Sequence, residues 1–184
     1  LCVPLISGGK TLGVLELMNK LDGSFFDEED RDMLAAFALQ AAVALDNARL
    51  YSDLKRAFAE TIRVMTNALE ARDPYTAGHT SRVTNIALEL ARELNWSRER
   101  IENLEIGALL HDIGKMGVPD HILLKSDKLT KEEWRIMQLH PLHAYEMLSP
   151  ISYLKPAIDI PYCHHEKWDG TGYPRGLKGD EIPL

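Results

Sequence analysis

Apolar residues recur at helical spacing along a segment that begins near Asp27 and ends near Arg72. Glu28, Glu29 and Asp30 follow Asp27, where the positive end of a helix dipole favours negative charge. We therefore predict one long helix here. Its apolar stripe has two sections that are out of phase by one residue, as at a stammer in a coiled coil. The first section is Leu34, Ala38, Ala41, Leu45 and Ala48, and the second is Tyr51, Leu54, Phe58, Ile62, Met65 and Leu69.

Two interpretations of this helix remain open. A coiled coil that forms a homodimer would place the apolar stripe against a second copy, while charged residues cover the other face. Alternatively, the segment is two helices, each of which packs on its own domain. We favour the dimer, because the helix links two domains of different pattern.

Before the long helix, residues 1–6 and 11–19 have the pattern of two strands joined by the turn Ser7-Gly8-Gly9. The second strand carries apolar residues at both even and odd positions, which predicts burial on both faces. These are Leu12, Val14, Leu15, Leu17 and Met18.

After the long helix the pattern is helical, and it predicts an all-α second half. Pro74 disfavours helical geometry at Asp73, so the helix should end there. New helices are expected over 79–94 and 98–111, with an interrupted helical segment over 152–165. The buried stripe of the first of these should be Val83, Ile86, Ala87, Leu90, Ala91 and Leu94.

Further on, Thr130-Lys131-Glu132-Glu133 has the spacing of a capping box. It predicts a helix that begins at Lys131 and carries His140, with a further short helix beginning at Pro141.

Composition excludes several classes of function. The formal net charge of −7 argues against a nucleic-acid polymer as partner. Two cysteines, Cys2 and Cys163, cannot form a disulfide scaffold, so we expect a reducing, cytoplasmic environment. We find no apolar run near the ~20 residues of a membrane span. We interpret the chain as a segment of a longer protein, because it begins within a predicted strand.

Histidine and aspartate form two groups that indicate a metal centre. His111-Asp112 precedes Ile113-Gly114-Lys115, and His164-His165 precedes a loop rich in turn-forming residues. Imidazole and carboxylate together suit metals such as iron, manganese or zinc. The carboxylate of Asp112 could bridge two metals, which would activate a water and hold a phosphodiester for in-line attack. Lys115 could neutralise charge on the phosphate.

These motifs resemble the HD-GYP family of cyclic di-GMP phosphodiesterases, a branch of the HD superfamily of metal phosphohydrolases. The likeness rests on His111–Lys115 and on His164–Pro174, which reads His-His-Glu-Lys-Trp-Asp-Gly-Thr-Gly-Tyr-Pro, and it covers roughly residues 60–184. It implies an all-α domain that binds two divalent metals, iron or manganese. The implied metal ligands are His79, His111, Asp112, His140, His164 and His165.

The resemblance also assigns other roles. Asp112 and Lys115 would be catalytic, and Lys115, Gly172, Tyr173 and Pro174 would contact the substrate. The family's last ligand, an aspartate, lies in a segment beyond the Gly-Tyr-Pro loop that this sequence does not include. Some members bind a third metal through a glutamate at the position of Tyr75, so the resemblance implies two metals here.

Each assignment has a simpler alternative. His79 and His140 alone could be ordinary, partly buried histidines, and Lys115 could pair with a surface acid. His143 lies one helical turn from His140 and could face the site, although the family's pattern gives it no ligand role. Glu166 could hydrogen-bond a ligating imidazole or form a surface salt bridge. Cys163 is expected to be a small buried residue, and Trp168 to pack within the loop.

The first part of the chain resembles the end of a GAF domain, an antiparallel sheet flanked by helices. The likeness rests on Pro4-Leu5, Gly13–Leu17 and Asn19-Lys20. The predicted fold is thus mostly α, with a β-hairpin from an α+β GAF domain, then a long linker helix and an all-α HD-type domain. We divide it at residues 1–50, 51–72 and 73–184.

The residues alone predict metal-dependent phosphoester hydrolysis, and the resemblance implies the substrate, so three functions remain open. The first is metal-dependent hydrolysis of cyclic di-GMP to linear pGpG and onward to GMP, regulated by the upstream GAF domain. The second is HD-type hydrolysis of another cyclic dinucleotide or nucleotide. The third is a signalling module that binds a nucleotide without turnover.

Overall fold

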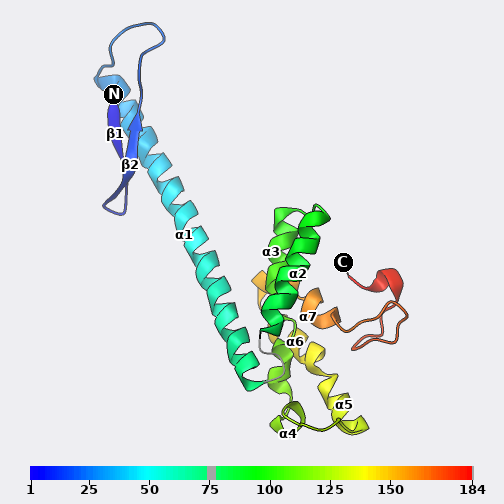
Figure 1. Cartoon of the computed structure of the whole chain (residues 1–184). Coiled ribbons are helices and arrows are strands. Elements are labelled where there is room, and N and C mark those ends of the chain that lie inside the picture. The colour runs from blue at the N-terminus through cyan, green and yellow to red at the C-terminus, as the bar shows by residue number, and fades with distance from the viewer. Residues whose placement is uncertain (74–77, 184) are drawn as a thin grey trace. The chain divides into compact units, whose positions relative to one another are not determined.

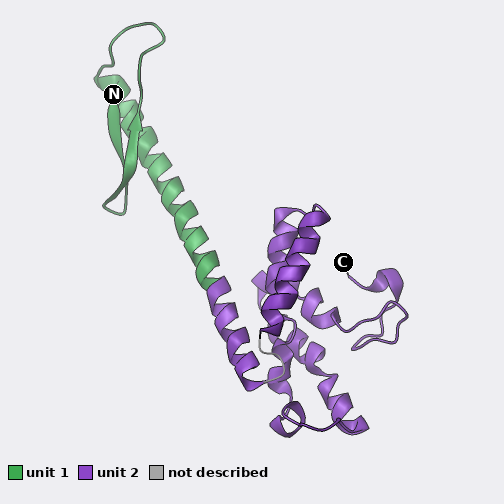
Figure 2. Ribbon diagram, viewed as in Figure 1, with its two compact units in different colours: residues 1–58 green, residues 59–184 purple. Residues whose placement is uncertain are grey.

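The protein is described here by a computed structural model that covers residues 1–73 and 78–183. Tyr75, the position discussed for a third metal, lies outside the described residues. The chain forms two compact units, residues 1–58 and 59–184 (Figure 2). The predicted domain boundaries after residues 50 and 72 stay predictions, and each unit is described by itself.

The first unit begins with an antiparallel hairpin. Strand β1 spans Cys2–Ser7 and β2 spans Lys10–Glu16, as the sequence pattern predicted (Figure 1). Gly8 and Gly9 form the turn with φ of 55° and 75°, values that glycine adopts without steric cost. Val3 packs against Leu34 and Ala38 of the following helix, so one face of the hairpin is buried there.

The expectation that β2 is buried on both faces is wrong. Val14 is 65% exposed, and Leu17 and Met18 beyond the strand are also exposed. Leu15 packs against the core of Val3, Leu34 and Ala38. An alternating strand with one open face is common in antiparallel sheets, where only one face needs to meet a core.

Helix α1 spans Glu28–Arg72, which confirms the long helix. Its beginning packs on the hairpin through Leu34 and Ala38. Its last turns belong to the second unit, where Ile62 and Leu69 are buried. The middle of the stripe is open: Leu45, Tyr51 and Leu54 are exposed.

The second unit consists of the last turns of α1 and of short helices that pack on one another. Helix α3 contacts α2 and α7, and α6 contacts α7 and the turn η1. These contacts bring the ends of α3, α6 and α7 together. The elements are α2 His79–Glu93, α3 Arg98–Leu110, η1 Ile113–Gly117, α4 Asp120–Leu123, α5 Lys131–Met137, α6 His140–Leu148, η2 Ser152–Ala157, α7 Asp159–Cys163 and η3 Gly179–Glu181.

The structure corrects the predicted position of His140. The capping box at Thr130 is present and starts α5 at Lys131, as predicted. However, α5 ends at Met137, and His140 is the first residue of α6. Pro141 is therefore the second residue of α6, where a missing N–H costs no helical hydrogen bond.

The buried stripe predicted for α2 is also wrong. Ile86 is 62% exposed, and Leu90 and Leu94 are exposed as well. The buried positions are Thr80, Thr84, Leu88 and Ala91, and of these only Ala91 belongs to the predicted stripe. The buried face of α2 is thus partly polar, because two of its four buried residues are threonines.

Candidate metal centre

Three helix ends carry the central histidines. His111 follows the last residue of α3, His140 begins α6, and His164 follows the last residue of α7. Because α3 and α6 both contact α7, these three ends lie close together.

The three imidazole rings share one local arrangement. The Nδ1 atom of each ring contacts the backbone carbonyl three residues earlier: His111 with Ala108 at 2.7 Å, His140 with Met137 at 2.8 Å, and His164 with Pro161 at 3.0 Å. A carbonyl only accepts, so we assign the ring proton to Nδ1 in each case. This leaves the Nε2 lone pairs free to bind a metal, and carbonyl partners of this kind orient metal-binding histidines.

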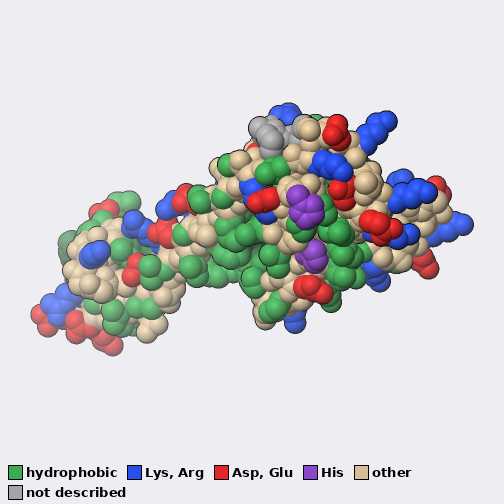
Figure 3. Space-filling model, turned by 90° about the horizontal axis from the view of Figure 1, so that it is seen from below, with side chains coloured by type: hydrophobic (Ala, Val, Ile, Leu, Met, Phe, Trp, Pro, Cys, Tyr) green, Lys and Arg blue, Asp and Glu red, His purple; other side chains and the backbone are tan. Residues whose placement is uncertain are grey.

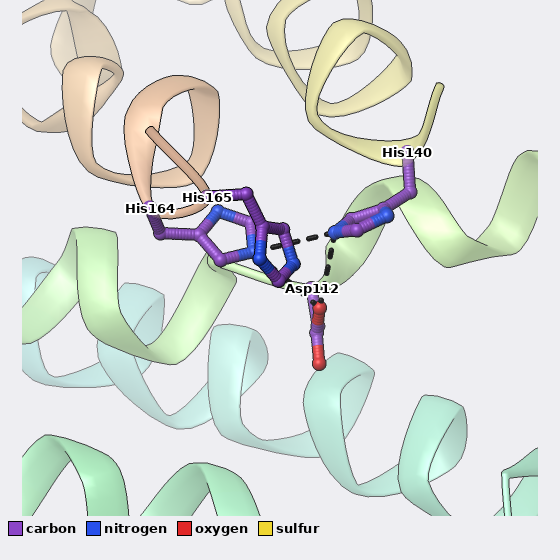
Figure 4. Close-up of side chains that lie close together, drawn as sticks. All are labelled: Asp112, His140, His164 and His165. Atoms are coloured by element: carbon purple, nitrogen blue, oxygen red, sulfur yellow. Dashed lines mark hydrogen bonds and ion pairs between the residues drawn. The ribbon is translucent and has the colours of Figure 1, made fainter. Parts of the chain in front are cut away.

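The Nε2 atoms of His111, His140 and His164 converge on the carboxylate of Asp112, and Figure 4 shows Asp112 with His140 and His164. His111 lies 3.3 Å from Asp112 Oδ2, while His140 and His164 lie 3.4 and 3.7 Å from Oδ1. His140 Nε2 and His164 Nε2 are 3.3 Å apart. Both oxygens of the Asp112 carboxylate therefore face histidine nitrogens.

The electrostatics of this cluster favour an ionised carboxylate and a neutral His140, but they favour charge on His111. Burial alone would raise the pKa of Asp112, but the imidazoles of His111 and His164 and the charge of Lys115 outweigh it and hold that pKa well below its usual range. Burial lowers the pKa of His140 to about 4. Burial also opposes the charge on His111, yet the hydrogen bond and charge of Asp112 raise its pKa.

His165 lies beside the same group. Its ring centroid is 5.0 Å from that of His140 and 4.1 Å from that of His164. Burial, followed by the charges of His164 and His140, lowers the pKa of His165 to about 3. It is a neutral donor at physiological pH, as a metal ligand must be.

The described residues contain two groups with the geometry of a metal site. One consists of Asp112, His140, His164 and His165, and the other of His79, His111 and Asp112. In each group one potential ligand atom per residue lies within 4.8 Å of the others. The groups share Asp112, so a bridging carboxylate between two metals fits the donors present.

Unprotonated nitrogens only 3.3 Å apart would repel each other, and a cation between them removes that conflict. Histidine side chains reach the face shown in Figure 3, among hydrophobic and charged side chains. Since His79, His164 and His165 are only partly buried, the cluster has access to solvent.

Lys115 borders the cluster. Its Nζ lies 2.9 Å from Asp112 Oδ2 and 3.4 Å from Oδ2 of Asp73, which is only 4% exposed. The alternative of a surface acid does not hold, because both partners are buried. Asp73 directly follows α1. The sequence predicted it only as the end of the long helix before Pro74, and not as a residue of the site.

The Gly-Tyr-Pro residues lie against His165. The Tyr173 ring stacks on the His165 ring with centroids 4.6 Å apart, and the Tyr173 amide donates to the His165 carbonyl at 3.2 Å. Burial raises the pKa of Tyr173 to about 12, so its hydroxyl stays protonated. Gly172 allows this approach: a Cβ there would lie 2.4 Å from Lys167 N. The Tyr173–Pro174 peptide bond is cis.

Gly114 of the His-Asp motif has a similar role. A Cβ at Gly114 would lie 1.8 Å from the carbonyl oxygen of His140. The turn η1 therefore packs backbone to backbone on α6, and this contact places Asp112 beside His140. The sequence motif contained this glycine, but only the structure shows its partner.

The remaining predictions have mixed outcomes. His143 lies outside both metal-ligand groups of the described residues, and it packs against Gly117. Cys163 is buried, as expected. Glu166 bonds neither an imidazole nor a cationic side chain in the contacts described; its carboxylate accepts the amides of Arg175 and Leu177. Trp168 is 71% exposed and does not pack within the loop as predicted.

Comparison with known proteins agrees with both parts of the chain. Residues 63–184 match the HD domain family, and residues 1–46 match the GAF domain family. The predicted fold, a GAF hairpin and long helix before an all-α HD domain, is confirmed.

Several curated relatives match two thirds or more of this chain. The 3'3'-cGAMP-specific phosphodiesterase 2 of Vibrio cholerae is 36% identical over 159 residues, covering 85% of this chain and 30% of that protein. The cyclic di-GMP phosphodiesterase response regulator RpfG of Xanthomonas campestris is 38% identical, covering 79% of this chain and 39% of that protein. A cyclic di-GMP phosphodiesterase of Thermotoga maritima is 43% identical, covering 68% of this chain and 34% of that protein. The chain thus spans 30–39% of the length of these relatives.

One property of α1 differs from the sequence-based expectation. By length and composition the helix meets the minimum for a membrane span, with a mean hydropathy of 1.2 in its most apolar 18-residue window. One helix of this kind is weak evidence for a membrane span, and Leu34 and Ala38 of α1 pack against the hairpin. We therefore assign no membrane segment on this property.

The family match covers most of the chain, and both ligand groups contain Asp112 and lie within the matched residues. The chain therefore belongs to the HD domain family, in its HD-GYP branch, and carries GAF-domain sequence before the HD domain.

Proposed function

We propose that the protein is a metal-dependent phosphodiesterase that hydrolyses cyclic di-GMP to linear pGpG and onward to GMP. The observation that carries this proposal is the pair of ligand groups joined by Asp112. Two metals that share a carboxylate are suited to phosphodiester hydrolysis. The names of the relatives from Xanthomonas campestris and Thermotoga maritima support the substrate.

We infer that the site holds two divalent metals, iron or manganese. One would be held by His79, His111 and Asp112, and the other by Asp112, His140, His164 and His165. A donor set of imidazoles with one carboxylate suits these borderline metals better than a thiolate set would. When bound, such metals supply an activated water and stabilise negative charge on the phosphate.

The other residues have roles that do not depend on ligation. Lys115 sits 2.9 Å from Asp112, close enough to reach a phosphate oxygen at the edge of the site. Its positive charge would stabilise the negative charge that develops on the phosphate. Tyr173, stacked on His165, offers a neutral hydroxyl and an aromatic face to the substrate. Gly172 and Pro174 shape the loop that presents it.

A second substrate has a specific observation in its favour. A 3'3'-cGAMP-specific phosphodiesterase 2 of Vibrio cholerae is 36% identical to this chain over 85% of its length, so relatives of both substrate classes match it. A hybrid cyclic dinucleotide differs from cyclic di-GMP in one base and keeps both phosphodiesters. Metals in the two groups would act on the phosphodiesters of either substrate. Contacts with the bases would therefore determine which substrate is preferred.

A module that binds nucleotide without turnover is the weaker alternative. Its site would need neither a full ligand set nor a lysine at Asp112. The ligands predicted from the motifs all fall within the two groups, which favours an enzyme.

We also propose that the protein is a cytoplasmic homodimer whose GAF domain regulates hydrolysis through α1. The exposed apolar residues in the middle of α1, including Leu45, Tyr51 and Leu54, would form the dimer contact. Two cysteines and no disulfide among the described residues fit a reducing compartment.

The test uses the full-length protein, purified without oxygen. Metal analysis and timed hydrolysis of cyclic di-GMP and 3'3'-cGAMP are measured on the same sample. About two metals per chain with linear product from cyclic di-GMP supports the proposal. Faster hydrolysis of 3'3'-cGAMP would support the second substrate, and nucleotide binding without product would support the third function. Asp112→Ala, which removes the shared ligand, should lose both metal and turnover.

A further inference from the structure

The carboxylate of Glu166 occupies a small anion-binding turn made by the backbone of its own loop. Oε1 accepts the amide of Arg175 at 2.7 Å, and Oε2 accepts the amide of Leu177 at 2.9 Å. Gly176 lies between these two residues and has φ of 68°. Successive amides around a left-handed residue form a concavity that binds anions, and here the anion is a side chain of the same chain.

Glu166 is placed between the metal ligands and this turn. It directly follows His165, a member of the ligand group with Asp112. Tyr173 precedes Arg175 by two residues and stacks on the His165 ring at 4.6 Å. The two hydrogen bonds therefore close a loop that begins beside His165. Tyr173 lies in this loop, two residues before the amide of Arg175.

Other contacts of the loop do not replace this closure. Asp169 bonds the amide and hydroxyl of Thr171, which orders only the tip of the loop. The Tyr173 amide donates to the His165 carbonyl at 3.2 Å, a single neutral bond. Hydrogen bonds to an ionised carboxylate are shorter and roughly twice as strong as neutral ones. The Glu166 bonds are thus the strongest contacts beside Tyr173.

We propose that Glu166 is a positioning residue that fixes the ring of Tyr173 on His165 through the amides of Arg175 and Leu177, and so sets the substrate side of the metal centre. This rests on the proposed function, because it gives Tyr173 a role in substrate binding. In the contacts that the structure describes, the Glu166 carboxylate bonds these two amides and no ring nitrogen of the ligand groups.

The variants are Glu166→Ala, which removes both acceptors, and Glu166→Gln, which keeps one. Gly176→Ala disturbs the same turn from the other side, since alanine is strained at that positive φ. The matched control is Glu181→Ala. Glu181 also accepts a backbone amide, that of Lys178 at 3.0 Å, but it does not bond the segment next to Tyr173.

Two measurements are made on the full-length protein: NMR after loading with Zn²⁺, which is diamagnetic, and kinetics on the anaerobically purified protein with the metals it holds. The NMR shift of the His165 ring protons reports Tyr173, because a stacked aromatic ring moves these signals upfield. Kinetics with cyclic di-GMP give kcat and KM separately, and metal content and thermal unfolding are recorded for each variant.

We expect Glu166→Ala and Gly176→Ala to lose the upfield shift while they keep their metals. Glu166→Ala should also keep its unfolding temperature, whereas the strain at the positive φ should lower that of Gly176→Ala slightly. Their kcat/KM should fall roughly 10- to 100-fold, the usual effect of removing a residue that orients a site. Glu166→Gln should fall between Glu166→Ala and the unchanged protein, and Glu181→Ala should match the unchanged protein.

The inference is overturned if Glu166→Ala keeps the His165 shift, or if it loses metal and unfolds at a lower temperature, which would make Glu166 merely structural. The NMR shift of the His165 ring protons can be measured whether or not the protein turns over a substrate. If the unchanged protein hydrolyses no cyclic dinucleotide, the proposed function fails, while the shift still decides whether Glu166 holds Tyr173.

Discussion

His140 Nε2 and His164 Nε2 lie 3.3 Å apart, although the two residues begin and follow different helices. Each ring points its Nδ1 at a backbone carbonyl, so both unprotonated nitrogens face the same space beside Asp112 Oδ1. Such an arrangement is costly for the metal-free protein and favourable once a cation is bound. The predictions below start from this relationship.

The first prediction concerns Asp112→Asn, which keeps the size of the side chain and removes its charge. The shared ligand would be lost from both groups, so metal content should fall to near zero and hydrolysis by more than ~1000-fold. Elemental analysis and a timed assay measure both. Asp127→Asn, at an exposed position, serves as control and should change neither. A metal content of two with normal activity in Asp112→Asn would rule out the shared carboxylate.

The stability of the metal-free protein should fall in mild acid. Burial lowers the pKa of His140 to about 4 and that of His165 to about 3, whereas an unfolded histidine titrates near 6.5. Between these values the unfolded state binds the extra proton, so stability is full above pH ~6.5 and is lost as the pH falls toward 4. His140, which is 1% exposed, accounts for up to ~3 kcal/mol of this loss.

Urea unfolding of the chelator-treated protein from pH 7.5 to 4.5 measures this dependence. His140→Gln should show a shallower slope over the same window. The raised pKa of His111 acts in the opposite direction, because its stabilisation is lost only as the pH rises through its folded pKa. Equal slopes in the variant and the unchanged protein would contradict the assignment to His140.

Lys115→Met should separate charge stabilisation from metal binding. The lysine is not a ligand, so metal content should stay unchanged, while kcat should fall roughly 100-fold through loss of charge at the phosphate. The variant also leaves buried Asp73 and Asp112 without this partner, so a lower unfolding temperature is expected. Normal kcat with full metal would assign Lys115 to structure alone. Lys128→Met, at an exposed position, is the control.

Gly114→Ala should destabilise the second unit and displace a ligand. Its Cβ would lie 1.8 Å from the His140 carbonyl oxygen, and backbone cannot move aside as a side chain can. We expect a loss of at least ~3 kcal/mol, measured by urea unfolding, together with reduced metal content. Gly13→Ala is the control, because its Cβ would meet Leu5 Cδ1 at an ordinary 3.8 Å. A stable Gly114→Ala protein with full metal would show that η1 and α6 can separate.

Leu54→Glu should abolish the proposed dimer without unfolding the chain. Leu54 is 68% exposed, so the substitution should change the stability of a single chain by ~0.5 kcal/mol or less. Sedimentation should show a monomer for Leu54→Glu and a dimer for Ser52→Glu, a change at an exposed polar position nearby. If both variants have the same mass as the unchanged protein, the apolar middle of α1 is not the dimer contact.

The elements were predictable where local chemistry determines them. Acidic residues at the start of α1, glycines at the hairpin turn and the capping box at Thr130 each act within one turn of the chain. The motifs also singled out the histidines that the structure brings together in the two groups. Their orientation was not predictable: the carbonyls of Ala108, Met137 and Pro161 are three residues away from them, a spacing that does not distinguish them from any other helical residue.

Failures came where packing partners determine the outcome. The apolar stripe of α2 is real, yet Ile86 and Leu90 are exposed while Thr80 and Thr84 are buried. A periodic pattern identifies an apolar face but not the neighbour that covers it. His140 was assigned to α5 for a related reason: the end of a short helix at Met137 depends on the contact of α6 with η1.

The last residue of α1, Arg72, and the residue after it, Asp73, contact residues that follow His111-Asp112. Arg72 donates to the Val118 carbonyl at 3.0 Å and to Asp120, and Asp73 contacts Lys115. With Ile62 and Leu69 buried in the second unit, the last turns of α1 complete that unit as well as connect to it. A protein shortened to begin at residue 73 would lose these buried side chains, so we expect a stable fragment of the second unit to start inside α1, near residue 59.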